Sequence, residues 1–160
     1  MSRTISNVRI TLTKLTDKAQ RFEITRLDGT TERVELLSRN FLLHDFSHFA
    51  VESVASLSEG FFGVLASGTT RATLNDKETT LERGMLQAEQ LSAPMQSRFM
   101  KRFARELYLE NLGAAYPAVV NDTFVDSVLE QLRKLMGEWK ATKCGESMVM
   151  EWAPPPQADS

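Results

Sequence analysis

The sequence predicts an α+β fold, in which a small N-terminal antiparallel β-meander packs against a bundle of about four helices. Apolar and polar residues alternate over most of the first 37 positions, which is the pattern of strands with one solvated face. After residue 40 the apolar residues recur at helical spacing instead. Alternation returns from Glu146 to Trp152, and this segment could join the meander as a further strand.

The length of the chain fits one domain. With 160 residues and a mass of 18.0 kDa, it can bury a substantial core without disulfides. No linker composition divides it, so we expect a single α+β domain over residues 1–153. The proline run at 154–156 and the polar residues after it predict a disordered tail over 154–160.

Charge and composition exclude several classes of protein. The formal net charge of -2 gives no electrostatic basis for binding nucleic acid. We find no signal-peptide pattern and expect no membrane span, because no apolar run approaches the roughly 20 residues that a span needs. The single cysteine, Cys144, cannot form an internal disulfide, which favours a reducing, cytoplasmic location.

Three strands are expected before residue 38, with turn residues between them. They cover Val8–Leu15, Gln20–Leu27 and Thr31–Leu37. The segments 16–18 and 28–29 carry the turn residues, so neighbouring strands should be antiparallel. The many charged residues between the apolar ones indicate that helices cover only one face of this sheet.

The helical patterns follow in order along the chain. The first helix should begin after an N-cap at Asn40 and end near Leu57. Helical segments are expected at 85–91 and 95–112, and Pro94 should break or kink the pattern between them, because proline lacks the N–H that a helix interior uses. The other expected segments are a short helix at 61–66, a loop or short helix at 69–83, and a long amphipathic helix at 124–142.

Chemistry concentrates on the first helix, which holds both histidines of the chain. His44 and His48 are one turn apart, and with Asp45 and Glu52 they lie within an arc of roughly 100° on one face. The opposite face is apolar and should be core. From Asn40 to Leu57 there is no Lys or Arg to neutralise these side chains.

This pattern predicts a divalent-metal site. Imidazole nitrogens at i and i+4 can reach one ion, and a carboxylate such as that of Glu52 can complete the ligand set. Zinc is the preferred metal, with iron and manganese as alternatives. A structural pair of histidines, hydrogen-bonded to Asp45 or Glu52, is the alternative interpretation.

Three resemblances bear on this site. The helix resembles the H-E-x-x-H helix of zinc proteases, with Asp45 in place of the glutamate base. His44, Asp45 and His48 match the H-D-x-x-H-x(11)-E motif of a family of ubiquinone-biosynthesis (coenzyme Q) proteins, which implies an acidic third ligand further along. Glu59 takes that place here at a spacing one residue shorter. The segment is also similar to a set of uncharacterised bacterial proteins with an H-D-x-x-H-x-x-V-E signature.

Two functions follow as hypotheses. The first is a metal-dependent hydrolase or lyase acting on a small molecule, with His44 and His48 as ligands, Glu52 or Glu59 as the third ligand, and Asp45 as a fourth ligand, an orienting group or the general base. The second is a non-catalytic interaction or assembly protein. Its homodimer would form through the amphipathic segments 99–109 and 124–139.

Overall fold

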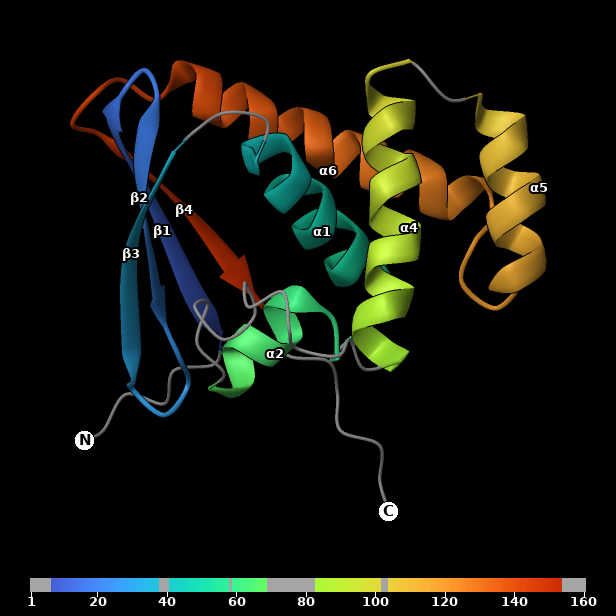
Figure 1. Cartoon of the computed structure of the whole chain (residues 1–160), viewed down its shortest axis with the longest axis horizontal. Coiled ribbons are helices and arrows are strands. Elements are labelled where there is room, and N and C mark those ends of the chain that lie inside the picture. Colours follow the sequence, from blue (N-terminus) through green and yellow to red (C-terminus); the bar gives the residue numbers. More distant parts are fainter. Residues whose placement is uncertain (1–6, 38–40, 58, 69–82, 102–103, 154–160) are drawn as a thin grey trace.

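The α+β prediction is confirmed by the structure, a computed structural model that describes residues 7–37, 41–57, 59–68, 83–101 and 104–153. Within these ranges the chain forms one four-stranded antiparallel sheet and five helices (Figure 1). The expected N-cap at Asn40, most of the 69–83 segment and the expected tail at 154–160 lie outside the described residues.

The C-terminal strand pairs with the first strand of the chain. The strands are β1 (Val8–Thr16), β2 (Ala19–Thr25), β3 (Thr31–Leu37) and β4 (Ser147–Trp152), in the order β3-β2-β1-β4. Ile10 stands opposite Ile24 on one side and opposite Met150 on the other. The fourth strand expected from the alternation is therefore present, and β1 lies in the interior of the sheet.

One face of the sheet is buried and the other is charged. The alternate residues Ile10, Phe22 and Met150 point into the core. The other face carries cross-strand ion pairs of arginine and glutamate: Arg9–Glu151, Arg21–Glu35 and Arg33–Glu23. A shift of one residue would exchange the two faces, so the burial pattern fixes the strand register.

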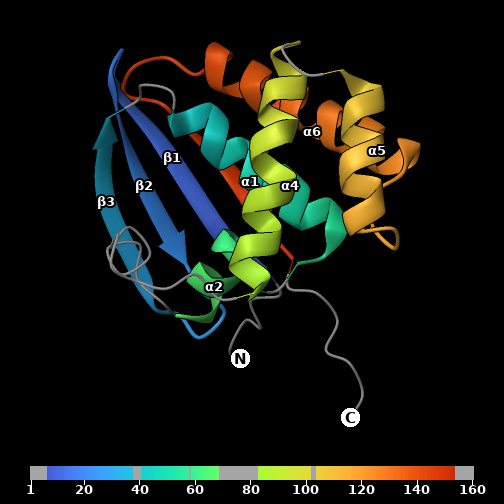
Figure 2. The ribbon, with the colours of Figure 1, turned by 45° about the vertical axis from the view of Figure 1, so that its right-hand side comes forward.

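The first helix, α1, occupies the centre of the molecule. The helices are α1 (Phe41–Ala55), α2 (Phe61–Ser67), α4 (Arg83–Phe99), α5 (Arg105–Ala115) and α6 (Asp122–Ala141). Figure 2 shows α1 between the sheet and α4. Phe46 and Phe49 pack into the sheet core, whereas Val51 packs in a second core with Leu91 and Met95 of α4. Both sides of α1 are thus covered.

The expected break at Pro94 is wrong, because α4 continues through this residue to Phe99. The segment expected at 95–112 is instead divided between α4 and α5, which begins at Arg105. Leu91 and Met95 are fully buried on either side of the proline, so packing holds the helix together despite the missing hydrogen bond. The Tyr108 hydroxyl of α5 donates to the Leu91 carbonyl at 2.9 Å. The helix ends instead near Lys101, whose φ of 61° is left-handed.

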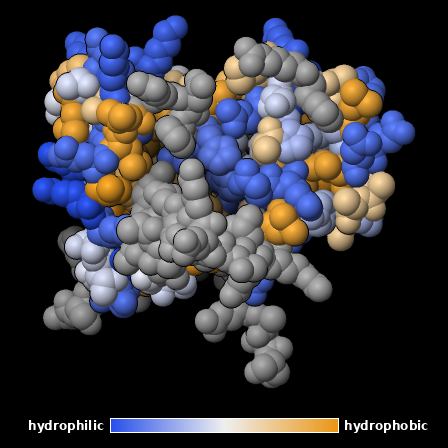
Figure 3. All heavy atoms as spheres, in the orientation of Figure 1, coloured by the Kyte–Doolittle hydropathy of each residue, from blue (hydrophilic) through white to orange (hydrophobic). Residues whose placement is uncertain are grey.

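The apolar face of α6 lies inside the protein. Asn121 caps this helix by accepting a hydrogen bond from the Phe124 N–H at 2.8 Å, and Leu132 and Trp139 are buried in the sheet core. On the face in Figure 3, hydrophobic residues form small separate groups among hydrophilic ones. No helix within the described ranges is long and apolar enough to cross a membrane.

Candidate metal centre

The second half of the polar face of α1 is buried, which its sequence pattern alone does not require. His48 is 4% exposed and Glu52 is 0% exposed. The face lies against α4 and the start of α2, through contacts to Glu89 and to Phe62. The absence of lysine and arginine from α1 is consistent with this position, since their charged ends would have no access to water.

Three side chains from two helices form a group that could hold a metal ion. His44 and His48 of α1 and Glu89 of α4 each offer one ligand atom, and these atoms all lie within 4.8 Å of one another. Glu89 Oε2 is 2.8 Å from His48 Nε2 and 3.9 Å from His44 Nε2. These three residues are called the ligand group below. Two imidazoles and a carboxylate suit zinc and iron(II) alike.

Glu52 orients His48 from the opposite side of its ring. One oxygen of Glu52 lies 2.9 Å from His48 Nδ1, and the other accepts the Phe62 N–H at 2.8 Å, in the first turn of α2. Gly60 permits this approach, because a Cβ there would overlap the Glu52 carboxyl group. A carboxylate on Nδ1 leaves Nε2 directed at the ligand group, as in many metal sites with histidine ligands.

Gln96 of α4 and the ring of His48 hold His44 in place. Its Nδ1 lies 3.3 Å from Gln96 Oε1, and its ring contacts the His48 ring edge-on with centroids 4.7 Å apart. With the Gln96 oxygen as acceptor, the proton of a neutral His44 sits on Nδ1 and the lone pair is on Nε2. That lone pair is on the nitrogen that faces Glu89.

The electrostatics around His48 favour a positive charge. Burial lowers the pKa of His48, but hydrogen bonds to Glu52 and Glu89 outweigh it and raise the pKa to about 9. The hydrogen bond from His48 lowers the pKa of Glu89. Without a metal, His48 is therefore a positively charged imidazolium at neutral pH, with a proton on both Nδ1 and Nε2. A divalent ion would replace the proton on Nε2.

The structure separates the residues that the sequence grouped together. Glu52 contacts the far nitrogen of His48, and it is not in the ligand group. Glu59 is exposed, and Asp45 is half-buried; neither belongs to the group. The residue missed by sequence reasoning is Glu89, which lies 41 positions after His48. Only the packing of α4 on α1 brings it there, and no local spacing signals it.

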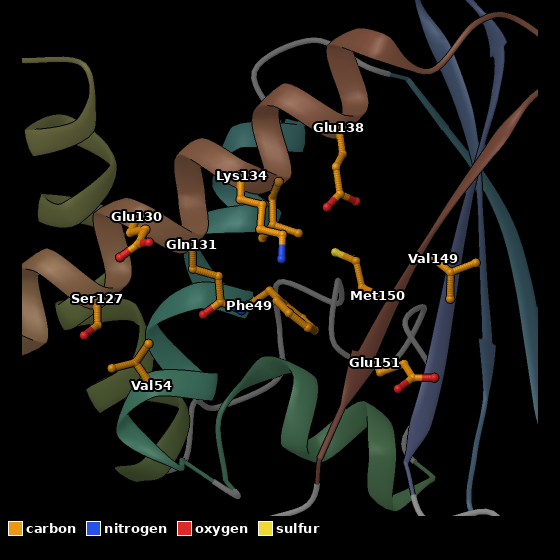
Figure 4. A pocket seen from close by; sticks show the side chains of 11 residues that line it. Phe49, Val54, Ser127, Glu130, Gln131, Lys134, Glu138, Val149, Met150 and Glu151 are labelled. Carbon is orange, nitrogen blue, oxygen red and sulfur yellow. The ribbon is translucent and has the colours of Figure 1, made fainter.

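A pocket of about 470 Å³ lies elsewhere, between α6, α1 and β4. Its floor includes Phe49, Leu135 and Met150, and charged side chains such as Lys134 and Glu138 surround it. In Figure 4, α6 runs along one side of this space and β4 along the other. No residue of the ligand group lines it, so the pocket and the histidines are separate features.

Comparison with known proteins assigns no family: no protein-family model, no curated protein and no solved structure matches this chain.

Proposed function

We propose that the protein binds a divalent metal ion through His44, His48 and Glu89 and uses it in hydrolysis or a lyase reaction on a small molecule. The observation that carries the proposal is the convergence of three ligand atoms within 4.8 Å, with a buried carboxylate orienting one of the ligands. Zinc is the metal of first choice, and iron(II) and manganese are the alternatives.

The distances require only small movements for coordination. Ligand atoms about 2.1 Å from a tetrahedral ion are roughly 3.4 Å apart. Glu89 Oε2 is 2.8 Å from His48 Nε2 and 3.9 Å from His44 Nε2, and all separations in the ligand group are within 4.8 Å. The side chains of His44 and Glu89 are partly exposed. Rotation of these two side chains would bring them to coordination distance, while His48 stays fixed by Glu52.

The charge of the site also supports a divalent ion. With Glu52 and Glu89 ionised and His48 protonated, these three side chains carry one net negative charge. A divalent ion with neutral His48 would bring the sum to zero, which lowers the free-energy cost of burial. His44 and Glu89 are 36% and 43% exposed, so water and a substrate could approach the ion from their side.

Given an open coordination position, the ion would supply Lewis acidity and lower the pKa of a bound water. Asp45 is our candidate general base, from its position next to His44 on α1. Glu52 takes the role of orienting His48 in this proposal, in place of direct coordination.

Metal binding is tested on protein purified without a histidine tag and stripped with a chelator. Titration calorimetry with zinc, manganese and iron(II) should give one site per chain in the wild type. His44→Ala and Glu89→Gln should lose most of the affinity, whereas Glu59→Gln, an exposed control, should keep it. Failure of all three metals to bind at one per chain would refute the proposal.

A second candidate is a non-catalytic interaction protein in which the histidines are structural. It is favoured by one observation: both ring nitrogens of His48 already have carboxylate partners, at 2.9 and 2.8 Å. In that case added metal would leave the melting temperature unchanged. The homodimer predicted for this alternative would appear in light scattering as twice the chain mass. It would have to form without the apolar face of α6, because that face packs inside the chain.

A further inference from the structure

Ser92 of α4 has a buried hydroxyl group that finds no partner in the part of the chain that the structure describes. Its side chain is 0% exposed, and its Oγ makes no hydrogen bond within the described residues. Ser47 of α1 provides the contrast, since it is also 0% exposed but its hydroxyl donates to the Leu43 carbonyl at 2.7 Å. That bond, to the carbonyl four residues earlier, is the usual solution for a serine inside a helix.

Ser92 shares a face of α4 with two residues that contact His44. It follows Glu89 by three residues and precedes Gln96 by four, so the three side chains share one face of α4. The two ring nitrogens of His44 contact Glu89 and Gln96, at 3.9 and 3.3 Å. The ring therefore spans the stretch of α4 in which Ser92 lies.

A buried hydroxyl without a partner destabilises a fold, and such a group in a native protein calls for an explanation. A missing ligand is one explanation. On the helix face that carries Glu89, a ligand that accepts a lone pair from the hydroxyl oxygen would be a cation.

We propose that Ser92 Oγ is an additional oxygen donor to the cation held by His44, His48 and Glu89. The inference rests on the proposed function and extends it, because it names a fourth protein donor. The complete set would contain two imidazole nitrogens, one carboxylate oxygen and one hydroxyl oxygen. The hydroxyl stays protonated in this arrangement, so no proton or electron is transferred.

The experiment compares Ser92→Ala with Ser47→Ala, a matched removal of a buried helix hydroxyl. Calorimetry with zinc and manganese should show a loss of affinity of about tenfold or more for Ser92→Ala and little change for Ser47→Ala. The stability of the metal-free protein should change in the opposite direction. Ser92→Ala should unfold at a higher urea concentration than the wild type, because the unpaired hydroxyl is gone.

A second variant tests the contact directly. Ser92→Cys replaces the hydroxyl with a thiol, and its cobalt(II) form should show a thiolate-to-cobalt charge-transfer band. Adding His44→Ala to this variant should abolish the band. The inference is overturned if Ser92→Ala binds metal as tightly as the wild type or if the band is absent while cobalt binds; Ser92 is then only a small residue where two helices cross. If the wild type itself binds no metal, the proposed function fails first and this inference fails with it.

Discussion

Two buried ionic clusters in this protein have opposite chemical characters. In the first, Arg26 donates to the Leu65 carbonyl at 2.6 Å and to Glu32 at 3.1 Å, which connects α2 to the sheet. In the second, His48 lies between Glu52 and Glu89. We call them the Arg26 cluster and the His48 cluster. Both central side chains are 4% exposed.

The clusters differ in whether the central side chain can exchange its proton for a metal ion. An arginine keeps its charge at every accessible pH, and its planar donors suit fixed partners. A histidine can lose its proton and then offer a lone pair to a metal. The glutamate paired with Arg26 is 15% exposed, whereas Glu89 is 43% exposed. A buried charge is thus structural when its partners are fixed, and a candidate site when one partner can be reached from solvent.

The largest expected effect comes from removing the fully buried member of the His48 cluster. Glu52→Ala leaves His48 with one carboxylate and the Phe62 N–H without an acceptor, so the free energy of unfolding should fall by about 3–5 kcal/mol. Urea denaturation measures this. Glu59→Ala, an exposed control, should change it by less than about 0.5 kcal/mol. Equal effects of the two substitutions would contradict a structural role for Glu52.

The second prediction concerns pH. The pKa of His48 is raised in the fold from 6.5 to about 9, so its stabilising effect is complete below pH 6.5 and is lost as the pH rises through 9. For metal-free protein the loss is about 3 kcal/mol. Urea denaturation from pH 6 to about pH 10 measures it.

His48→Gln is the control for this titration, because it removes the group but keeps its size approximately. The variant should lose the additional pH dependence and keep that of the other residues. If the free energies of unfolding of the wild type and the variant change in parallel with pH, the proton bound on folding is not on His48.

The Arg26 cluster should respond to mutation but not to pH. Arg26→Met keeps much of the side-chain volume but leaves the Leu65 carbonyl and Glu32 without this donor, which should lower the free energy of unfolding by about 2 kcal/mol. The loss should be the same at pH 6 and pH 9, and metal affinity should not change. A dependence on pH or metal would remove the distinction between the clusters.

The smallest effect on stability should come from the glycine beside Glu52. Gly60→Ala forces its Cβ against the carboxyl group, and we expect a loss of about 1–2 kcal/mol. Metal affinity should fall by about tenfold, because His48 loses its orienting partner.

The matched control is Gly137→Ala, since a Cβ at Gly137 in α6 meets nothing within 4 Å. That substitution should stabilise the protein by about 0.5–1 kcal/mol. If Gly60→Ala were equally benign, the close approach of Glu52 would not matter for the site.

The sequence predicts the elements of this protein better than the partners within its site. Alternation identifies β3 at Thr31–Leu37 with the observed bounds, and the amphipathic pattern identifies α6 within two residues at its start. These signals are local, since each depends on a repeat along the chain. Glu89 reaches the ligand group only through the packing of α4 on α1. No local repeat encodes that contact.

The same distinction explains the error at Pro94. Local chemistry favours an interruption of the helix, but Leu91 and Met95 are buried on both sides of the proline, and tertiary packing overrides the local preference. The position of Glu52 outside the ligand group has a related cause. Spacing places Glu52 on the correct face of α1, but it cannot tell which nitrogen of His48 the carboxylate will meet.

The pairing of β1 with β4 has a consequence for synthesis of the chain. Val8 stands opposite Trp152, so one side of β1 stays unpaired until the residues of β4, far along the chain, have been synthesised. Closing so long a loop is entropically slow, and an open strand edge can pair with other chains in the meantime. We therefore expect a chain truncated before residue 147 to be aggregation-prone, because the edge of β1 that pairs with β4 then stays open.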